Sequence, residues 1–242
     1  MVRTFQQHSS FNYPWTSCIH AFFLRYPNPL ATHVLTVDVL DRHIECRRAE
    51  SDAQKVVLCT ARLILKRGSL PSWAPQGIIK NTQSWVLEES EVDLSPRDGG
   101  APRTMSIWTQ NLDHTSVMTV TERLRFTEEA PSHTLCDTRA DVTSAALAVL
   151  RGRIEKFGYK RYKAHHATAA EGLIWTIRHL GPILRSDMDV EALRAPKALS
   201  KKKRLLHALR PPFLDGYPIG PFQWLRKKWR QMRGHETPLL NV

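Results

Sequence analysis

The sequence predicts an α+β fold in which a seven-stranded antiparallel sheet is covered by a long helix. Apolar and polar residues alternate through most of the region 4–143, as in strands that bury one face. The links between these segments are mostly short, and short links join antiparallel strands because parallel strands need long crossovers. A long segment with helical periodicity follows, and such a helix can close a curved sheet into a half-barrel.

Seven segments with this period-two pattern are expected to be strands. They cover residues 4–12, 33–46, 55–66, 84–93, 103–111, 117–127 and 133–143. The sixth is typical, because Met118, Val120 and Phe126 fall on one face. Glu122 interrupts that apolar face, so we expect its carboxylate either to be paired inside the protein or to line a wet cavity.

Two segments are expected to be helical. A short helix is predicted over residues 15–24, and a long one over 144–180. In the long helix, side chains at three- and four-residue steps form an apolar stripe that cations join near its middle. The stripe consists of Leu147, Leu150, Ile154, Phe157, Arg161 and Tyr162.

The composition is that of a folded protein that does not cross a membrane. The 242 residues are 42% hydrophobic, and no stretch approaches the roughly 18 apolar residues of a membrane span. No cleavable targeting pattern is visible at the N-terminus. The cysteines occur singly without histidines at metal-ligand spacing, so buried structural thiols are expected. They are Cys18, Cys46, Cys59 and Cys136.

Enzyme motifs are missing from the sequence. It has no glycine-rich phosphate loop, no Gly-x-Ser-x-Gly turn and no His-Glu-x-x-His motif. The adjacent His165 and His166 point in different directions on a helix, which fits surface or rim positions better than paired metal ligands. We therefore expect neither catalytic residues nor a metal or other cofactor.

The net charge of +12 implies an anionic partner, either nucleic acid or an acidic membrane surface. Because Lys and Arg concentrate toward the C-terminus, we expect a globular domain over 1–180 and a basic extension over 181–242, partly helical or disordered. Phe222, Trp224 and Trp229 interleave with cations in the extension. That pattern suits an acidic membrane interface, and a solvated basic tail is the alternative.

Four motifs in a specific order carry a family resemblance. They are Ala21-Phe-Phe-Leu-Arg25-Tyr-Pro-Asn-Pro29, His33-Val-Leu, Arg62-Leu-Ile-Leu-Lys66-Arg67-Gly68-Ser-Leu-Pro71-Ser-Trp73 and Asn111-Leu-Asp-His-Thr115. Over roughly residues 1–175 the chain resembles the PRELI/MSF1 family, and within it the fungal Ups branch that handles phosphatidic acid. The resemblance implies a helix-grip fold like that of START and PITP domains, enclosing a lipid cavity gated by a mobile loop.

The resemblance also implies a function. Members of this branch shuttle lipids in the mitochondrial intermembrane space, bound to a small helical protein with twin Cys-x9-Cys motifs that assists import and stability. For this chain it implies a soluble or peripheral carrier of phosphatidic acid between the outer and inner membranes, in support of cardiolipin synthesis. The alternatives are a carrier of phosphatidylserine or another acidic phospholipid, a tail-anchored scaffold that does not release lipid, and a nucleic-acid-binding protein.

Five residues match family positions implicated in headgroup binding or transfer: Arg25, His33, Arg62, Lys66 and Arg161. Cations suit this role because a buried phosphate must be paired. Alternatively, Arg25 complements the end of the short helix, and His33 is a rim or core histidine. Arg62 and Lys66 share one face of a strand, which favours a shared ligand or a shared solvated face.

The segment 68–77 is rich in glycine and proline and is expected to form a lid. Its lid residues are Gly68, Leu70, Pro71 and Trp73. Apolar side chains on such a loop would cover the cavity in water and dip into a bilayer on docking. An ordinary surface loop is the alternative.

The apolar strand faces are expected to line the cavity or to form plain core. The candidates are Val37, Val39, Leu63, Leu65, Val86, Met118 and Val120. Ser69 and Thr168 stand where the branch pattern has lysines. These two departures bear on headgroup preference more than on the fold.

Overall fold

The computed structural model describes residues 2–48, 54–68, 82–95, 102–146 and 148–186. The chain divides into two compact units, Met1–Arg185 and Ser186–Val242, and only the first is described below. Beyond residue 186 the predicted basic extension lies outside the described residues. Within the described part, no helix is long and apolar enough to span a bilayer.

All seven predicted strands are confirmed. They are β1 (Arg3–Phe11), β2 (Val34–Arg48), β3 (Gln54–Arg67), β4 (Gln83–Asp93), β5 (Thr104–Asn111), β6 (Thr119–Ala130) and β7 (His133–Thr143). They form one antiparallel sheet in the order β1-β7-β6-β5-β4-β3-β2. Strands β2 to β7 are therefore a meander, as expected. Strand β1 pairs with β7 instead of β2, because helix α1 (Trp15–Leu24) and a short 3-10 turn, η1 (Pro29–Ala31), separate β1 from β2.

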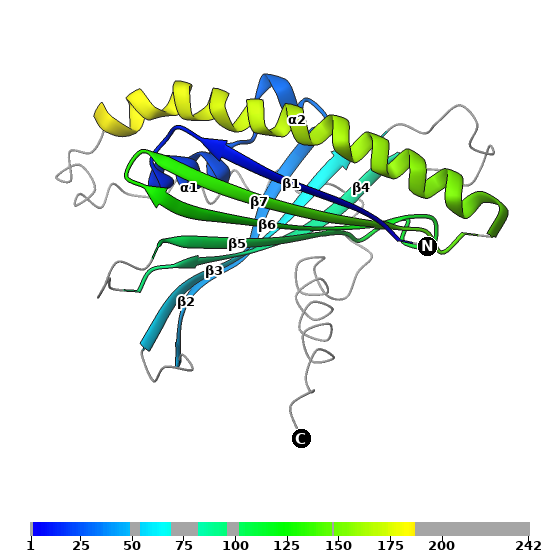
Figure 1. Ribbon diagram of the computed structural model, residues 1–242, viewed down its shortest axis with the longest axis horizontal. Helices are drawn as coiled ribbons and strands as arrows, with labels where there is room; N and C mark the ends of the chain where they lie inside the picture. The colour runs from blue at the N-terminus through cyan, green and yellow to red at the C-terminus, as the bar shows by residue number, and fades with distance from the viewer. Residues whose placement is uncertain (1, 49–53, 69–81, 96–101, 147, 187–242) are drawn as a thin grey trace, which may run out of the picture. The chain divides into compact units, whose positions relative to one another are not determined.

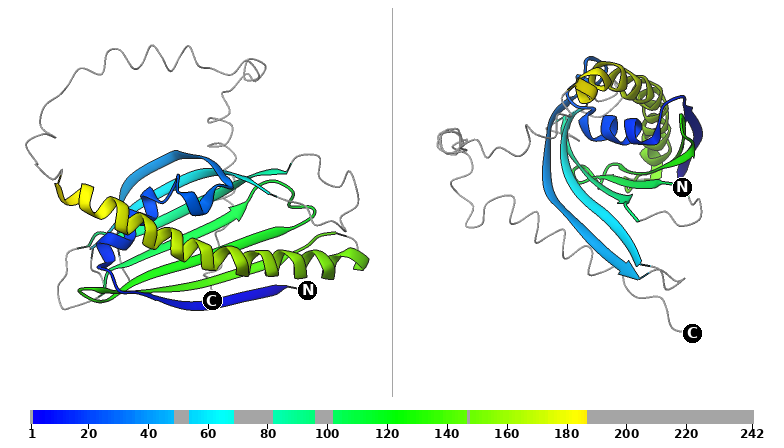
Figure 2. Two further views of the ribbon diagram at one scale, coloured as in Figure 1. Left: turned by 90° about the horizontal axis from the view of Figure 1, so that it is seen from above. Right: turned by 90° about the vertical axis from the view of Figure 1, so that its left-hand side faces the viewer.

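The sheet curves around its helices, as the half-barrel prediction requires. Figures 1 and 2 show α1 and the long helix α2 (Ala148–Ser186) on the concave side of the sheet. Two register irregularities in β2, between Val34 and Thr36 and between Val39 and Asp41, contribute to the bend of this edge strand. The fold is the expected helix-grip arrangement, with one long helix lying across a strongly bent sheet.

Helix α1 is anchored by its apolar face. The ring centroid of Phe22 lies 5.9 Å from that of Phe126, which in turn lies 6.2 Å from Phe11 of the edge strand β1. Cys18, on the same helix, is completely buried. Because α1 ends at Leu24, this packing fixes the position of Arg25, the next residue.

Helix α2 begins later than predicted and extends further, from 148 to 186 instead of 144 to 180. Tertiary hydrogen bonds of Ser144 explain the late start. The buried Ser144 hydroxyl donates a hydrogen bond to the Val117 carbonyl at 2.6 Å and accepts one from the Ala146 amide at 3.2 Å. These bonds commit Ser144 to the turn between β7 and α2.

The cysteines agree with the sequence expectation except at one position. Cys18, Cys59 and Cys136 are buried free thiols. Cys46, however, is exposed, so the expectation of a buried thiol is wrong there. It lies near the end of β2, where the β2–β3 hairpin extends away from the helices (Figure 2).

Candidate functional site

A cavity of about 420 Å³ lies between the concave face of the sheet and the helices. Its wall is formed by residues from β1, α1, η1, the end of β3, strands β4 to β7 and α2, together with loop residues such as His33, which directly precedes β2. Most of this wall is apolar, with Val120, Leu124 and Phe126 from β6 facing Ile154 and Phe157 from α2. The predicted stripe therefore faces the cavity from Leu150 to Tyr162, while Leu147 lies outside the described residues.

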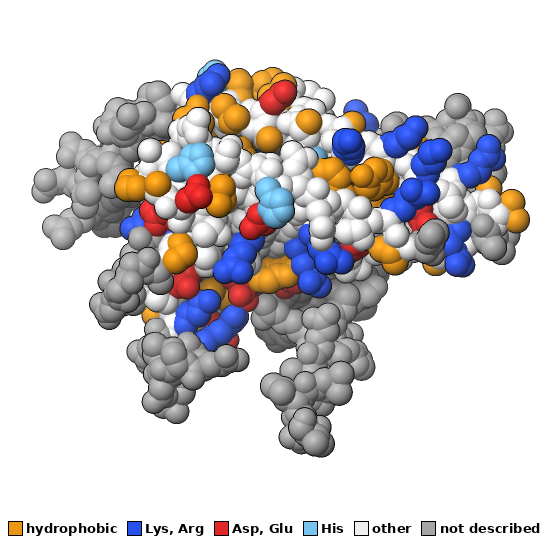
Figure 3. Space-filling view, viewed as in Figure 1, with side chains coloured by type: hydrophobic (Ala, Val, Ile, Leu, Met, Phe, Trp, Pro, Cys, Tyr) orange, Lys and Arg blue, Asp and Glu red, His pale blue; other side chains and the backbone are white. Residues whose placement is uncertain are grey.

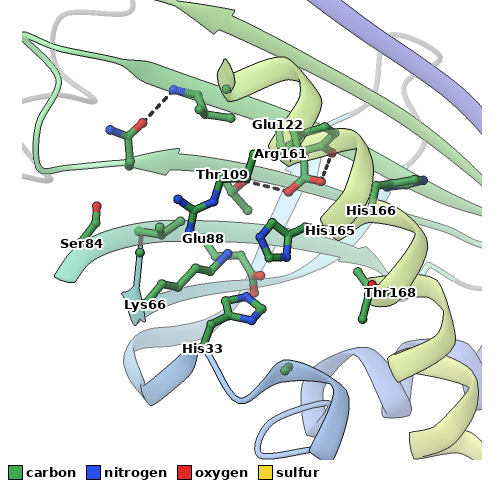
Figure 4. A pocket seen from close by; sticks show the side chains of 18 of the residues that line it. His33, Lys66, Ser84, Glu88, Thr109, Glu122, Arg161, His165, His166 and Thr168 are labelled. Carbon is green, nitrogen blue, oxygen red and sulfur yellow. Dashed lines mark hydrogen bonds between the residues drawn. The ribbon is translucent and has the colours of Figure 1, made fainter. Parts of the chain in front are cut away.

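Two cations and two histidines meet in one part of the cavity, which we call the cationic cluster. It consists of His33, Lys66, Arg161 and His165, and Figure 4 shows these side chains converging from the residue just before β2, from the end of β3 and from α2. The His33 and His165 rings lie 5.0 Å apart. Burial, followed by the charges of Lys66, His165 and Arg161, lowers the pKa of His33 to about 4. Burial and the same two cations lower the pKa of His165.

A buried ion-pair network lies beside the cationic cluster. Arg25 Nη2 donates to Glu88 Oε2 at 2.5 Å, and Arg62 Nε donates to Glu88 Oε1 at 2.7 Å. Arg62 also donates to the Phe23 carbonyl at 2.9 Å, which ties α1 to the sheet. Glu88 is 1% exposed, and although burial alone would raise its pKa, the two guanidinium groups hold that pKa below its usual range. Two arginines share one carboxylate, so the network keeps one net positive charge.

Glu122 belongs to a second polar group in the cavity wall. Its carboxylate accepts hydrogen bonds from the Tyr162 hydroxyl and, at 3.1 Å, from the Thr109 hydroxyl. The His166 ring stacks on Tyr162. Both alternatives for Glu122 thus hold, because the carboxylate is paired and also lines the cavity.

The family assignment follows from the sequence match over this domain. The family model described as the PRELI-like family matches residues 16–182, which include α1, β2 to β7 and most of α2. The chain belongs to the PRELI-like family.

Proteins of similar sequence are known from fungi and animals. Protein ups1 homolog of Schizosaccharomyces pombe is 31% identical over 169 residues, covering 69% of this chain and 90% of that protein. Protein UPS1, mitochondrial, of Saccharomyces cerevisiae is 30% identical, covering 69% and 87%. The human PRELI domain-containing protein 1, mitochondrial, is 29% identical, covering 84% and 87%.

Two solved structures are also similar. A Streptomyces aromatase/cyclase has a TM-score of 0.47 at 8% identity, covering 74% of this chain and 96% of that chain. A START superfamily protein from Mycobacterium smegmatis has a TM-score of 0.37 at 14% identity, covering 73% and 98%.

In this PRELI-like domain, four of the five predicted headgroup residues line the cavity: Arg25, His33, Lys66 and Arg161. Arg62 is not among the lining residues and is 3% exposed, because its guanidinium is bound to Glu88. Sequence reasoning missed Glu88, because only the strand register places it opposite Arg62. The expected surface or rim position of His165 is confirmed, because the residue is exposed and also lines the cavity, one helical turn after Arg161.

The predicted lid is only partly described. Gly68 lines the cavity, and its amide donates to the Thr82 carbonyl at 2.6 Å. Leu70, Pro71 and Trp73, as well as Ser69, lie outside the described residues.

The predicted lining residues divide into two sets. Val86, Met118 and Val120 line the cavity, as does Thr168. Val37, Val39, Leu63 and Leu65 are not among the described residues that line it. Val39 is 53% exposed. Leu63 is buried, but on the face of the sheet opposite to that of Arg62. These residues of the β2–β3 hairpin therefore do not form cavity wall.

A possible cation-binding group appears only in three dimensions. His43 and Cys59 pair across β2 and β3, and their ligand atoms and a Glu45 carboxylate oxygen lie within 4.8 Å of one another. Arg47 donates to Glu45 at 2.7 Å and to Glu91 at 2.9 Å. This guanidinium already satisfies the carboxylates by which a metal ion would be held.

The depressed pKa of His33 predicts a pH-dependent stability. An unfolded histidine takes up a proton near pH 6.5, whereas folded His33 does so only near pH 4, so protonation favours unfolding as the pH falls between about 6.5 and about 4. His33→Gln should therefore raise the melting temperature relative to wild type more at about pH 5 than at about pH 7.5. His20→Gln, at an exposed position of α1, controls for loss of a histidine. An equal difference at both pH values would contradict this assignment.

Proposed function

We propose that this chain is a non-enzymatic carrier that moves phosphatidic acid between the outer and inner mitochondrial membranes, in support of cardiolipin synthesis. The observation that carries the proposal is the cationic cluster at one part of a mostly apolar cavity. Exposing an acyl chain to water costs about 0.8 kcal/mol of free energy for each methylene, so a carrier needs an apolar cavity that encloses the chain. A phosphate next to those chains needs buried cations and donors.

The charges favour a phosphomonoester headgroup. Such a group carries up to two negative charges near neutral pH. Lys66 and Arg161 supply two positive charges, and the Arg25–Glu88–Arg62 network supplies one more. Arg161 can also present paired N–H donors to two phosphate oxygens.

The carboxylates argue against an amino headgroup such as that of phosphatidylserine. Three acidic residues line the cavity: Glu88, Asp113 and Glu122. Each already accepts hydrogen bonds from protein donors, Asp113 from the Trp85 amide at 2.7 Å. An ammonium group would therefore have to compete with existing bonds for every nearby carboxylate.

The cellular setting rests on the relatives. Two of those reported above carry "mitochondrial" in their descriptions, at 30% and 29% identity. We extend this location to the present chain, and specifically to the intermembrane space, with a small twin Cys-x9-Cys helical protein as partner and acidic membranes as peripheral docking surfaces. The intermembrane space and the small partner rest on the family resemblance, and the acidic membranes rest on the net charge of +12.

The test is transfer of fluorescent phosphatidic acid between liposomes by the chain co-expressed with its small partner. Lys66→Gln should slow transfer at least about 10-fold, because a charge-assisted hydrogen bond contributes about 1.5–3 kcal/mol. Lys55→Gln is the matched control, since Lys55 lies at the other end of β3 and pairs with Asp93 at 3.5 Å, outside the cavity. Its transfer rate should equal that of wild type.

Two results would contradict the proposal. If the folded wild-type complex transfers no acidic phospholipid, the carrier function is wrong. If it transfers phosphatidylserine as fast as phosphatidic acid, the headgroup assignment is wrong and the carrier function stands.

A further inference from the structure

The outward face of α2 carries a row of cations. Arg153, Lys156, Lys160 and Lys163 follow one another at three- and four-residue steps, and all four are exposed. We call this row the basic stripe. Figure 3 shows Lys and Arg side chains gathered along this part of α2. The step pattern places Val149, which is 87% exposed, on the same face at the start of the helix.

Around the three lysines of the basic stripe, Lys156, Lys160 and Lys163, the carboxylates that usually balance a solvated helix face are scarce. Helix α2 contains only two acidic residues, of which Glu155 is 2% exposed and Glu171 lies two turns beyond Lys163. Among the described residues, no ion pair involves Lys156, Lys160 or Lys163. Like charges at this spacing destabilise a helix, and an external anion that binds the lysines would offset this repulsion.

The outer face of the sheet is organised differently. There Arg139 pairs with Asp141 at 3.4 Å, and His133 pairs with Glu129 at 3.2 Å. Cations and carboxylates alternate along these strands, as is typical of an ordinary solvated surface. The high net charge of the chain therefore does not by itself explain the basic stripe.

The opposite face of the same helix segment belongs to the cavity. Arg161, next to Lys160, lines the cavity together with His165 and Thr168, one and two turns further on. A surface that contacts the basic stripe thus lies one helix diameter, roughly 10 Å, from the phosphate-binding residues. From Val149 to Lys163 the stripe spans about 20 Å, at 1.5 Å per residue.

We propose that the basic stripe docks the carrier onto an anionic lipid bilayer, with α2 lying along the headgroup layer. This inference rests on the proposed function and names the surface that brings the cavity to its lipid. Lysine ammonium groups meet lipid phosphates, and Val149 enters the apolar boundary of the interface. Ala164 and Ala167 lie beside the last lysine of the stripe, and their small size lets the helix approach a flat surface closely.

A bilayer fits the basic stripe better than a nucleic acid does. Proteins that bind single-stranded nucleic acid interleave aromatic side chains with the cations for base stacking. No aromatic residue occupies a stripe position between Val149 and Ala167. An exposed valine at its end has no role on a phosphodiester backbone but suits a membrane interface.

The test uses the full chain with its partner and vesicles of phosphatidylcholine with or without phosphatidylglycerol. Replacing Lys156, Lys160 and Lys163 together with glutamine should lower partitioning onto anionic vesicles about 100-fold, since each cation contributes about 1 kcal/mol at such a surface. Wild type should bind only the anionic vesicles, and less tightly at high salt. Lys160→Gln alone should lower partitioning about 5-fold, which keeps the test valid if the triple variant does not fold.

The matched control replaces Arg123, Arg125 and Arg139, three exposed cations of the outer sheet face, with glutamine. If this control loses vesicle binding equally, net charge and not the basic stripe causes the binding, and the docking role is overturned. Unchanged vesicle binding by the stripe variants would also overturn it. If the stripe variants lose binding to single-stranded RNA while wild type binds no vesicles, the partner is nucleic acid.

A second readout separates docking from carrying. Binding of water-soluble dihexanoyl phosphatidic acid should be the same in wild type and stripe variants, while vesicle binding and liposome transfer fall together in the variants. Loss of short-chain binding in the stripe variants would place the lysines in the lipid site and overturn the docking role. Failure of wild type to bind the short-chain lipid would count against the proposed function and leave the vesicle result to decide the docking surface.

Discussion

Glu88→Ala is expected to lower the free energy of unfolding by about 3–5 kcal/mol, because it removes the one carboxylate that pairs two buried guanidinium groups. Arg62 is 3% exposed and Arg25 has a side chain that is 15% exposed, so neither charge can be hydrated without rearrangement. Urea unfolding of the two proteins at one pH measures the difference. Glu129→Ala, at a side chain that is 52% exposed, should change stability by less than about 1 kcal/mol.

A double variant separates the ion pair from simple packing. Glu88→Leu combined with Arg62→Leu removes a carboxylate and a guanidinium together, and leaves the network with the single positive charge of Arg25. It should be more stable than Glu88→Leu alone by about 1–3 kcal/mol, because no second buried cation is left unpaired. If the double variant is the less stable of the two, the cost lies in packing and the network has been misassigned.

The same network limits how the headgroup can be probed. Arg25→Glu would place a second carboxylate beside Glu88 and disturb the anchoring of α1. Loss of transfer in that variant would not distinguish a missing phosphate ligand from a damaged fold. Lys66 is the better probe because, although it lines the cavity, it forms no ion pair within the described residues.

Most of the fold could be predicted from local pattern. Side chains of a half-buried strand alternate between its two faces whichever strand it pairs with. The period-two pattern of apolar residues therefore predicted all seven strands before their pairing was known. The neighbour of β1 and the start of α2 could not be predicted in this way. The first depends on where α1 leads the chain, and the second on hydrogen bonds between Ser144 and Val117 that join residues far apart in sequence.

The site was harder to predict, because charge in a sequence does not reveal its partner. Arg62 and Lys66 lie on the same strand face, yet one is bound to a carboxylate and the other lines the cavity. The difference arises from the β3–β4 register, which places Glu88 opposite Arg62 and Ser84 opposite Lys66. Val39 lies opposite Arg62 on the same face of the sheet, yet it is 53% exposed and is not among the described residues that line the cavity, which the alternation of β2 could not reveal.

Gly158→Ala is expected to destabilise the protein by about 1–3 kcal/mol, although alanine favours a helix by about 1 kcal/mol over glycine. Helix α2 packs on β6 and β7 at Gly158, where an added Cβ would lie 2.5 Å from Met118 Sδ and 2.8 Å from Val142 Cγ1. The Met118 side chain can move, but the branched Val142 is fully buried and cannot. The helix must therefore lift away from the sheet.

Gly152→Ala, six residues earlier on the same helix, is the matched control. Nothing lies within 4 Å of its added Cβ, so the substitution should stabilise the protein by about 0.5–1 kcal/mol through helix propensity alone. Urea unfolding should thus separate the two variants by about 1.5–4 kcal/mol. Equal effects would mean that α2 does not rest on β6 and β7 at Gly158. Since Met118 also lines the cavity, its displacement in Gly158→Ala should slow lipid transfer as well, whereas Gly152→Ala should leave transfer unchanged.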